Sequence, residues 1–346
     1  MRYLTWEECL KEKPFAAVVD VRSPAEYAEN HIPGAVNLPV LDNAERAEVG
    51  TLYCQVSRFD ARRLGAAMVA RNAARHLESF FAPWPEHARF LLYCWRGGQR
   101  SRALATILHA VGWNITVISG GYKNYRAWVR EGLKRVAPQL QCRILTGLTG
   151  SGKSRLLRRM AEAGHQVLDL EALGCHRGSL LGMEPGRPQP SQKHFESLLL
   201  QAMERFDLSR PVWVESESKR LGRLWIPEEL WQVMMRAPVH KLQVPREARA
   251  RFLAGDYRHF IEAPDSLLAM LPVLKEACGG RTLLRWEELI RAGQWEAFTD
   301  SILELHYDPV YCRCSDYAAP AFTHAMPAME DAAMDAVINE MTGTTR

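Results

Sequence analysis

The sequence predicts an α/β protein with two consecutive domains, each built on a parallel sheet with flanking helices. Three observations lead to this prediction. Short apolar stretches alternate with helical patterns from about residue 15 to residue 245, which is typical of parallel sheets covered by helices. Two of these stretches run into a glycine-containing loop and a helix start, the first at Cys94 and the second at Gly147. The chain of 346 residues also exceeds the usual size of a single domain.

Composition and charge narrow the class of protein. Hydrophobic residues make up 47% of the chain, and the net charge of +4 gives only weak support for nucleic-acid binding. The eight cysteines are scattered, and the pair Cys312 and Cys314 lacks a second pair, so we assign neither a disulfide framework nor a metal ligand. The N-terminus lacks an apolar signal core, and no apolar run is long enough to span a membrane. We therefore expect a cytoplasmic protein with no membrane partner.

The first domain is predicted over residues 1–135. An apolar strand occupies 15–21, and Ser23 and Glu26 have the spacing of a capping box at the start of the next helix. A long amphipathic helix is expected over 59–77. This helix carries four arginines, Arg62, Arg63, Arg71 and Arg75. Without further evidence, such a charged row predicts a face directed to solvent.

The strongest catalytic candidate lies in the stretch Tyr93-Cys94-Trp95-Arg96-Gly97-Gly98-Gln99-Arg100-Ser101. A buried strand precedes it and a helix follows it, so Cys94 lies where the strand ends. The two glycines allow the loop to curl until successive N–H groups point inward as an anion-binding nest. With the helix N-terminus and the two arginines, these groups favour a nucleophilic thiolate. The alternative is a small buried structural cysteine, which needs no such surroundings.

A phosphate-binding candidate follows a linker predicted at 136–142. A short strand ends at Thr146, and the chain continues Gly147-Leu148-Thr149-Gly150-Ser151-Gly152-Lys153-Ser154. This is a complete P-loop pattern between a strand and a helix. Backbone N–H groups of the glycine-rich loop would surround a diphosphate, Lys153 would neutralise it, and Ser154 is placed to hold a metal ion.

The P-loop domain is predicted over 143–317, with a C-terminal tail at 318–346 that is poor in core residues. A strand over 211–215 ends in Glu215, which would bring an acid to the phosphate site. No water-positioning residue is evident after Glu215, which argues against nucleotide hydrolysis. The basic helix 246–258 is either a lid over phosphate or, more simply, a solvated face.

The first domain resembles rhodaneses. The similarity rests on the stretches 20–27 and 31–39, on Cys94 with its arginine loop, and on Gly120-Gly121-Tyr122. Five residues separate Cys94 from Arg100, whereas rhodaneses usually have four. The longer loop is similar to that of cysteine-dependent phosphatases and would accept a tetrahedral, phosphate-bearing donor. A phosphatase is therefore a rival from another reaction class.

A rhodanese-like domain in front of a P-loop resembles the tRNA 2-selenouridine synthase family. Further matching stretches are 48–53, 176–179, 190–192 and 306–309. The resemblance implies an enzyme that alkylates the sulfur of wobble 2-thiouridine in tRNA with geranyl diphosphate. It then replaces the geranylthio group with selenium from selenophosphate. In this scheme Cys94 carries selenium as a selanylcysteine, and Arg96 and Arg100 hold the donor.

The same scheme requires no resident cofactor, is compatible with Mg²⁺, and implies a selenophosphate-producing enzyme as a partner. We expect geranyl diphosphate at the P-loop, with ATP or GTP as the runner-up. The arginines of helix 59–77 would contact tRNA phosphates, and Trp95 would stack on an anticodon base. The prenyl chain would lie on five apolar residues: Leu180, Leu181, Phe195, Leu198 and Leu199.

Two other functions remain open. One is a cysteine-dependent phosphatase or sulfurtransferase coupled to a nucleotide-binding P-loop domain. It predicts turnover of a generic phosphoester and no affinity for tRNA. The other is a non-catalytic rhodanese-like module beside a nucleoside kinase, which predicts ATP-dependent phosphorylation of a small molecule. The intact Cys94 argues against this last function.

Overall fold

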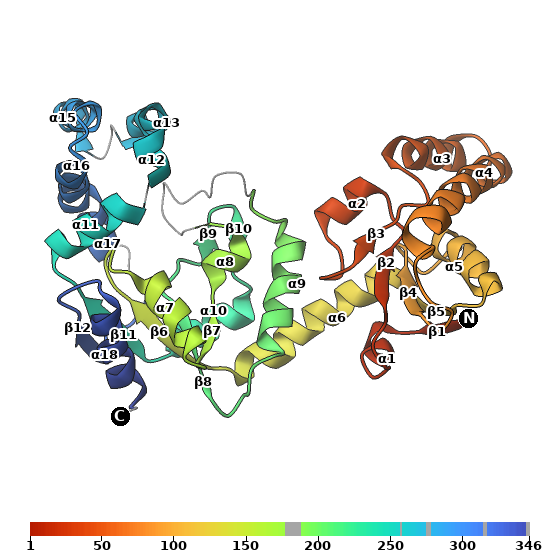
Figure 1. The fold of residues 1–346 in the computed structure, drawn as a ribbon, viewed down its shortest axis with the longest axis horizontal. Helices are drawn as coiled ribbons and strands as arrows, with labels where there is room; N and C mark the ends of the chain where they lie inside the picture. The colour runs from red at the N-terminus through yellow and green to blue at the C-terminus, as the bar shows by residue number, and fades with distance from the viewer. Residues whose placement is uncertain (177–187, 257, 275–277, 314–316, 344–346) are drawn as a thin grey trace. The chain divides into compact units, whose positions relative to one another are not determined.

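The computed structural model describes residues 1–176, 188–256, 258–274, 278–313 and 317–343 (Figure 1). The chain forms two compact units. The first consists of Met1–Arg135 and Pro190–Gln201, and the second of Val136–Gln189 and Ala202–Arg346. Among the described helices, none is both long enough and apolar enough to cross a membrane.

The first unit is built on a five-stranded parallel sheet with the strand order β1-β5-β4-β2-β3 (Figure 1). Its strands are β1 (Arg2–Leu4), β2 (Ala17–Asp20), β3 (Val36–Asn37), β4 (Arg89–Tyr93) and β5 (Asn114–Ile118). The central strand β4 is buried because its apolar side chains face helices on both sides. This arrangement confirms the predicted rhodanese-like sheet and places Cys94 at the carboxyl end of the central strand.

Helices cover both faces of this sheet. They are α1 (Trp6–Cys9), α2 (Pro24–Glu29), α3 (Asn43–Gln55), α4 (Arg58–His76), η1 (Leu77–Phe81), α5 (Gln99–Val111) and α6 (Gly121–Val136). The predicted start of α2 is confirmed, because the Glu26 carboxylate accepts a hydrogen bond of 3.1 Å from the Ser23 N–H. The expected helix over 59–77 is α4, and α3 packs against it.

A segment from beyond the P-loop completes the first unit. Residues 190–201, which include most of α9 (Gln192–Met203), belong to this unit. The Nδ1 atom of His194 lies 3.1 Å from the side-chain oxygen of Asn30, and the Ser197 hydroxyl donates to the same oxygen over 3.4 Å. The first unit is therefore discontinuous in sequence. The predicted domain, 1–135, lacks its second segment, 190–201.

The second unit has its own five-stranded parallel sheet, ordered β12-β11-β6-β8-β7. Its strands are β6 (Gln141–Thr146), β7 (Gln166–Leu168), β8 (Pro211–Glu215), β11 (Val239–Gln243) and β12 (Phe322–Ala325). The P-loop joins the central strand β6 to α7 (Lys153–Glu162). A short antiparallel ribbon, β9 (Arg220–Leu221) with β10 (Leu224–Trp225), follows β8. The remaining sheet-side helices are α8 (Leu170–Gly174) and α10 (Glu228–Arg236).

Two boundary predictions are corrected by this sheet. The predicted tail, 318–346, contributes strand β12 and helix α18 (Asp331–Thr342) to the unit. Four apolar residues of α18 are buried in the core: Met334, Val337, Ile338 and Met341. The predicted linker, 136–142, holds the end of α6, the short helix η2 (Ala137–Gln139) and the first residues of β6. Met334, Val337, Ile338 and Met341 recur at helical spacing, so α18 has a core-facing side and is not a tail.

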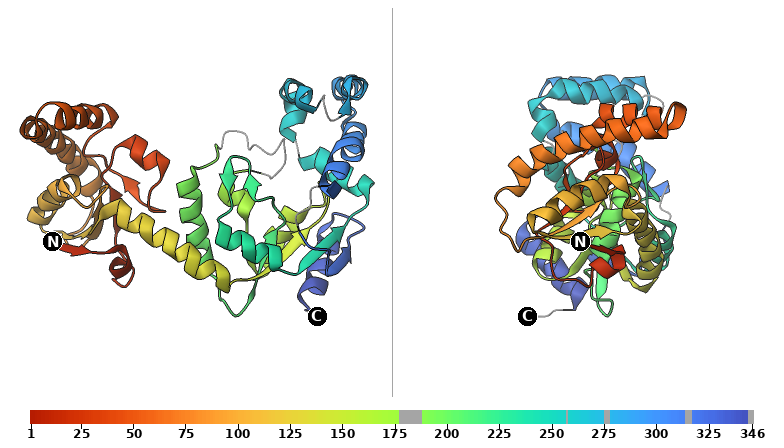
Figure 2. Two further views of the ribbon diagram at one scale, coloured as in Figure 1. Left: turned by 180° about the vertical axis from the view of Figure 1, so that it is seen from behind. Right: turned by 90° about the vertical axis from the view of Figure 1, so that its right-hand side faces the viewer.

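A group of helices lies between β11 and β12 in sequence (Figure 2). It comprises α11 (Arg246–Asp256), α12 (Arg258–Glu262), α13 (Pro264–Met270), η3 (Leu271–Leu274), α15 (Gly280–Arg291), α16 (Trp295–Ile302), η4 (Leu303–Tyr307) and α17 (Asp308–Arg313). These helices have an apolar core of their own around the fully buried Trp286. The first of them, α11, packs against the P-loop, because Arg249 is buried and donates a hydrogen bond of 3.0 Å to the Thr149 carbonyl.

Candidate functional site

The sulfur of Cys94 lies in a small nest of hydrogen-bond donors. The Gly98 N–H donates to Sγ over 3.1 Å, and the Ser101 hydroxyl donates over 3.2 Å. Cys94 is the first residue after β4, and α5 begins at Gln99, so the loop between them is short. Donors aimed at sulfur stabilise negative charge on it, whether on a thiolate or on an atom bound to it. Sequence reasoning did not assign Ser101 a role, although it directly follows Arg100.

Backbone crowding explains the glycines of this loop. Gly97 has φ of 64°, and a Cβ there would lie 2.5 Å from the carbonyl oxygen of Ile118. A Cβ on Gly121, at φ of 58°, would lie 2.2 Å from the carbonyl oxygen of Cys94. By contrast, a Cβ on Gly98 would meet no atom within 4 Å. The close packing of two loops therefore requires Gly97 and Gly121, whereas Gly98 has steric freedom.

The two arginines of the Cys94 loop differ in exposure and in their partners. Arg96 is exposed, whereas the guanidinium of Arg100 forms an ion pair of 2.6 Å with Glu26. Burial acts to raise the pKa of Glu26, but the hydrogen bond and charge of Arg100 outweigh it, and the pKa is lowered. The fully buried Arg22 is held by Asp20 at 2.6 Å, and its guanidinium carbon lies 4.1 Å from the centre of the Tyr122 ring. The two predicted donor-binding arginines thus differ, because only Arg96 is directed to solvent.

The P-loop has the conformation that its glycines predict. Gly150 and Gly152 have φ of 79° and 74°, and a Cβ on Gly152 would lie 2.4 Å from the methyl carbon of Met329. The ammonium group of Lys153 donates to the carbonyl oxygen of Gly147 over 2.8 Å and lies 3.4 Å from the Glu215 carboxylate. Burial acts to lower the pKa of Lys153, but the neighbouring carboxylates, Glu215 foremost, raise it to about 12. This lysine is therefore charged and ready to bind an anion.

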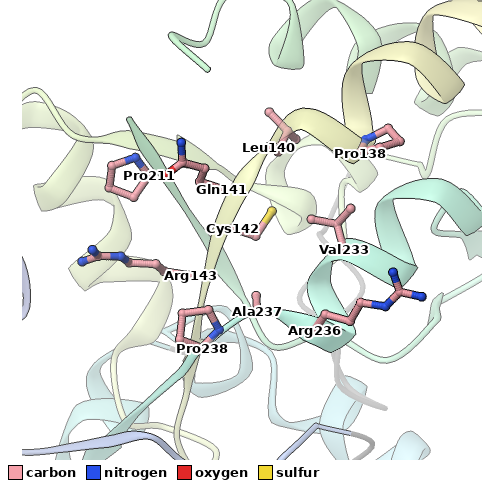
Figure 3. Close-up of a pocket in the computed structure, with 10 residues that line it drawn as sticks. All are labelled: Pro138, Leu140, Gln141, Cys142, Arg143, Pro211, Val233, Arg236, Ala237 and Pro238. Carbon is pink, nitrogen blue, oxygen red and sulfur yellow. The ribbon is translucent and has the colours of Figure 1, made fainter. Parts of the chain in front are cut away.

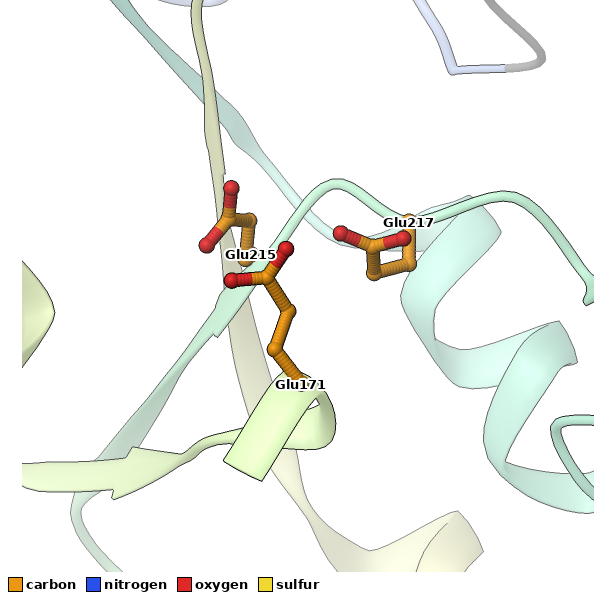
Figure 4. Close-up of side chains that lie close together, drawn as sticks. All are labelled: Glu171, Glu215 and Glu217. Atoms are coloured by element: carbon orange, nitrogen blue, oxygen red, sulfur yellow. The ribbon is translucent and has the colours of Figure 1, made fainter. Parts of the chain in front are cut away.

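Three carboxylates meet at the P-loop (Figure 4). Ligand atoms of Glu171, Glu215 and Glu217 all lie within 4.8 Å of one another. The Ser154 hydroxyl lies 2.9 Å from Glu171 and 3.0 Å from Glu215. Burial and then the charge of Glu215 raise the pKa of Glu171 to about 8, and the same two causes raise the pKa of Glu217 well above its usual value. A hydroxyl and three carboxylates are the hard oxygen donors that Mg²⁺ prefers, so the residues fit a divalent cation.

Only one of these three acids, Glu215, is predicted from the sequence. Glu215 ends β8 as predicted, whereas Glu217, two residues later, has no predicted role. Glu171 has no predicted role because it lies on α8, which follows β7, and only the pairing of β7 with β8 brings it next to Glu215. Its hint in the sequence was the pair Asp169 and Glu171 directly after a short strand, where Asp169 caps the helix.

Two of the cavities that the described residues of the second unit enclose lie near its sheet. The larger, about 490 Å³, opens at the amino ends of the strands, where Gln141 begins β6 and Pro211 begins β8 (Figure 3). This cavity therefore lies where the strands begin, whereas the P-loop lies where β6 ends. The smaller cavity, about 60 Å³, adjoins Thr149 of the P-loop and is bounded by the helices that follow β11. Its apolar wall is formed by Leu253, Ala254, Phe260, Ile261, Leu267, Trp295, Phe298 and Ile302.

The other predicted site residues fall in different places. Arg62, Arg63, Arg71 and Arg75 are all exposed on α4. Phe195 and Leu199 have no exposed surface, so they do not line an open groove as predicted. Leu180, Leu181 and Cys314 lie outside the described residues, as does the side chain of Cys312.

Comparisons with known proteins agree with this division of the chain. A family model for the rhodanese-like domain matches residues 6–127, and one for the tRNA 2-selenouridine synthase AAA domain matches residues 140–265. A protein of Cupriavidus pinatubonensis named tRNA 2-selenouridine synthase is 31% identical, over 85% of this chain and 87% of its own length. The chain belongs to the tRNA 2-selenouridine synthase family. Membership of this family accounts for the presence of both sites, the Cys94 loop and the P-loop, in one chain.

Other members of the family are more similar over a shorter region. The tRNA 2-selenouridine synthase of Nitrosomonas europaea is 37% identical over 69% of this chain, and that of Aeromonas salmonicida is 35% identical over 70%. These matches span 63% and 65% of the two relatives' own lengths.

Proposed function

We propose that this protein is a tRNA 2-selenouridine synthase that works in two steps. It geranylates the sulfur of wobble 2-thiouridine with geranyl diphosphate, then replaces the geranylthio group with selenium from selenophosphate. The observation that carries the proposal is the pairing, in one chain of this family, of a cysteine whose sulfur accepts two hydrogen bonds with a P-loop backed by three carboxylates.

In the first step the sulfur of 2-thiouridine attacks the allylic carbon of geranyl diphosphate. A carbon–sulfur bond forms, the carbon–oxygen bond breaks, diphosphate leaves with the electron pair, and the N3 proton of the base passes to water. The P-loop N–H groups and Lys153 stabilise the charge that develops on the leaving diphosphate. A divalent cation held by Ser154 and the carboxylates would add to this stabilisation.

The small cavity beside the P-loop is where we place the geranyl chain. Leu253 of its wall lies against the P-loop, since a Cβ on Gly150 would approach its side chain to 2.6 Å. The Thr299 hydroxyl in the wall already donates to the Trp295 carbonyl over 2.7 Å. An apolar chain can enter without breaking this hydrogen bond of the wall. A nucleobase would have to give up its own hydrogen bonds to water on entering. This location replaces the groove expected around Phe195 and Leu199.

In the second step selenium attacks C2 of the alkylated base. The carbon–selenium bond forms, the carbon–sulfur bond breaks, and geranylthiolate leaves. Selenium comes from selenophosphate, which a separate enzyme must supply. The phosphorus–selenium bond breaks with its electron pair on selenium, the phosphoryl group ends on water as phosphate, and Cys94 is required for this transfer. The exposed arginines of α4 are proposed to contact tRNA phosphates. The cytoplasm, where tRNA and reduced thiols occur, is the proposed compartment.

The proposal is tested with an anticodon-stem oligonucleotide that contains 2-thiouridine. The wild-type protein, given geranyl diphosphate and selenophosphate, should yield 2-selenouridine by mass spectrometry of the nucleosides. Cys94→Ala should accumulate the geranylated nucleoside and form at least about a hundredfold less 2-selenouridine, because alkylation needs no cysteine. Cys54→Ala, which changes an exposed cysteine on α3, is the matched control. Normal selenation by Cys94→Ala would contradict the proposal.

A nucleotide is the second candidate for the P-loop. The observation that favours it is the acidic cluster, because a serine and carboxylates at a P-loop are also what Mg²⁺–nucleotide complexes use. Binding of ATP or GTP in preference to geranyl diphosphate, with turnover of an aryl phosphate and no tRNA affinity, would support a phosphatase or sulfurtransferase coupled to nucleotide binding instead.

A further inference from the structure

We propose that the Cys94 loop is a phosphoryl-accepting site, in which the thiolate attacks the phosphorus of a phosphorus–selenium bond. The bond belongs either to selenophosphate itself or to a selenophosphoryl adduct on the tRNA base. This inference rests on the proposed function and assigns the chemical role of Cys94 within it. It replaces the selanylcysteine implied by the family resemblance.

The thiolate of Cys94 could attack either selenium or phosphorus, and the two reactions differ in where the electron pair of the phosphorus–selenium bond goes. If the thiolate attacked selenium, the phosphorus–selenium electron pair would remain on phosphorus and the product would be phosphite. If it attacks phosphorus, the sulfur–phosphorus bond forms, and selenium leaves with the pair, either as hydroselenide (HSe⁻) that keeps the proton of the donor or as a tRNA selenolate. Water then attacks the phosphocysteine, the sulfur–phosphorus bond breaks, and phosphate and the thiolate are released. The second direction needs no oxidant or reductant.

The loop has the width and the donors for a tetrahedral phosphoryl group. Five residues separate Cys94 from Arg100, and Gly97 turns the chain through a positive φ of 64°. The first turn of α5, which begins at Gln99, has N–H groups without acceptors inside the helix. The Gly98 N–H is already directed at the sulfur over 3.1 Å. Charge on the transferring oxygens is therefore met by backbone donors close to the sulfur.

Ser101 is placed to assist the second reaction step, the hydrolysis of the phosphocysteine. Its side chain is fully buried, and its hydroxyl lies 3.2 Å from Sγ and 3.2 Å from the Gly98 carbonyl. When the sulfur–phosphorus bond breaks, this hydroxyl stabilises the thiolate that leaves. The first reaction step needs less help, because hydroselenide, HSe⁻, and a tRNA selenolate are both weakly basic leaving groups. Loss of the hydroxyl should therefore slow breakdown of phosphocysteine more than its formation.

The experiment uses selenophosphate with radiolabelled phosphorus and the full-length protein. Acid-quenched samples of wild type, Ser101→Ala, Cys94→Ala and Cys54→Ala are compared with and without the S-geranylated oligonucleotide. We expect label on wild type and on Cys54→Ala, none on Cys94→Ala, and about tenfold more retained by Ser101→Ala. Label without the oligonucleotide identifies free selenophosphate as the substrate, and label only with it identifies the tRNA adduct.

Formation of 2-selenouridine is measured in the same reactions. If wild type forms 2-selenouridine but carries selenium and no phosphorus on Cys94, the phosphoryl mechanism is overturned and the proposed function stands. If no 2-selenouridine forms at all, the proposed function fails, whatever label the protein carries. If Ser101→Ala is poorly folded by circular dichroism, vanadate inhibition of wild-type selenation replaces it, because vanadate mimics a phosphoryl group in transfer. Selenation that is insensitive to saturating vanadate would then overturn the mechanism.

Discussion

The ammonium group of Lys153 lies 3.4 Å from the carboxylate of Glu215, at the carboxyl ends of two neighbouring strands of the second sheet. The ammonium group is therefore paired with an acid of the protein itself. A diphosphate that enters the P-loop would add to this pairing, since its negative charge meets the loop N–H groups and the lysine together.

Lys153→Ala is expected to block geranylation, because the leaving diphosphate loses its neutralising charge. A reduction of about a hundredfold or more is typical when a charged group that stabilises a leaving anion is removed. Selenation of ordinary 2-thiouridine oligonucleotide should fail as a consequence. An oligonucleotide that is already geranylated should be selenated normally, because the Cys94 loop is untouched. If this rescue fails in a folded variant that still binds tRNA, the P-loop serves the selenium step.

Glu217→Gln is expected to raise the Mg²⁺ concentration needed for half-maximal geranylation by about tenfold, because one of three carboxylate ligands loses its charge. Steady-state rates across a Mg²⁺ titration give the measurement. Glu162→Gln changes an exposed acid at the end of α7, the helix that carries Ser154, and should leave the titration unchanged. Equal rates with and without EDTA in the wild type would show that the cluster does not use a cation.

Ala254→Phe is expected to fill the apolar cavity beside the P-loop and to shift the choice of diphosphate toward shorter chains. The ratio of kcat/KM for geranyl diphosphate to that for dimethylallyl diphosphate should fall by about tenfold, equivalent to about 1.4 kcal/mol. Ala297→Phe adds the same ring at an exposed position of α16 and serves as the control. An unchanged ratio in Ala254→Phe would place the chain elsewhere.

Replacement of Arg62, Arg63, Arg71 and Arg75 by glutamine is expected to flatten the salt dependence of tRNA binding. Each lost phosphate contact should reduce the slope of log affinity against log salt by about 0.7 to 0.9. A control variant with Arg281, Arg285 and Arg291 replaced removes exposed arginines from α15 instead. Filter binding across a salt series measures both slopes. An unchanged slope in the α4 variant would mean that this helix is only a solvated face.

The second sheet is expected to lose stability in acid through His240. The His240 ring on β11 lies 3.1 Å from His324 on β12, and His324 lies 2.7 Å from Glu340 on α18. Burial, then the charges of His324 and of Arg143 on β6, lower the pKa of His240 to about 4. A lowered folded-state pKa gives stability that is present above about pH 6.5 and is lost as the pH falls toward 4.

Hydrogen-exchange protection of β11 and β12 should therefore weaken across this interval, by up to about 1.4 kcal/mol per pH unit for one proton. His240→Gln should flatten the profile, and His87→Gln, at an exposed position, should keep it. A wild-type profile that is flat between pH 4 and 6.5 would contradict the prediction.

The sequence by itself determined the features whose chemistry lies in contiguous residues. The Cys94 loop and the P-loop are each a strand end, a glycine turn and a helix start, so residue order places their N–H groups and side chains. The alternation of apolar stretches with helices determined the two parallel sheets for a related reason, since burial on both faces requires that pattern. The contact of Ser101 with Cys94 could also have been predicted, because Ser101 lies in the first turn of the helix that follows the loop.

Only the tertiary structure decided which distant residues meet. Glu171 joins Glu215 and Glu217 because β7, which α8 follows, and β8 end side by side, and nothing local to Glu171 specifies that neighbour. The same holds for the cavity beside the P-loop, whose lining comes from Thr149 and from α11, α12, α13, α16 and η4. The predicted tail became β12 and α18 because Met334 and its apolar neighbours bury against a core built by earlier strands. Contacts between residues far apart in sequence depend on how whole elements pack, and their free energy arises only once that packing exists.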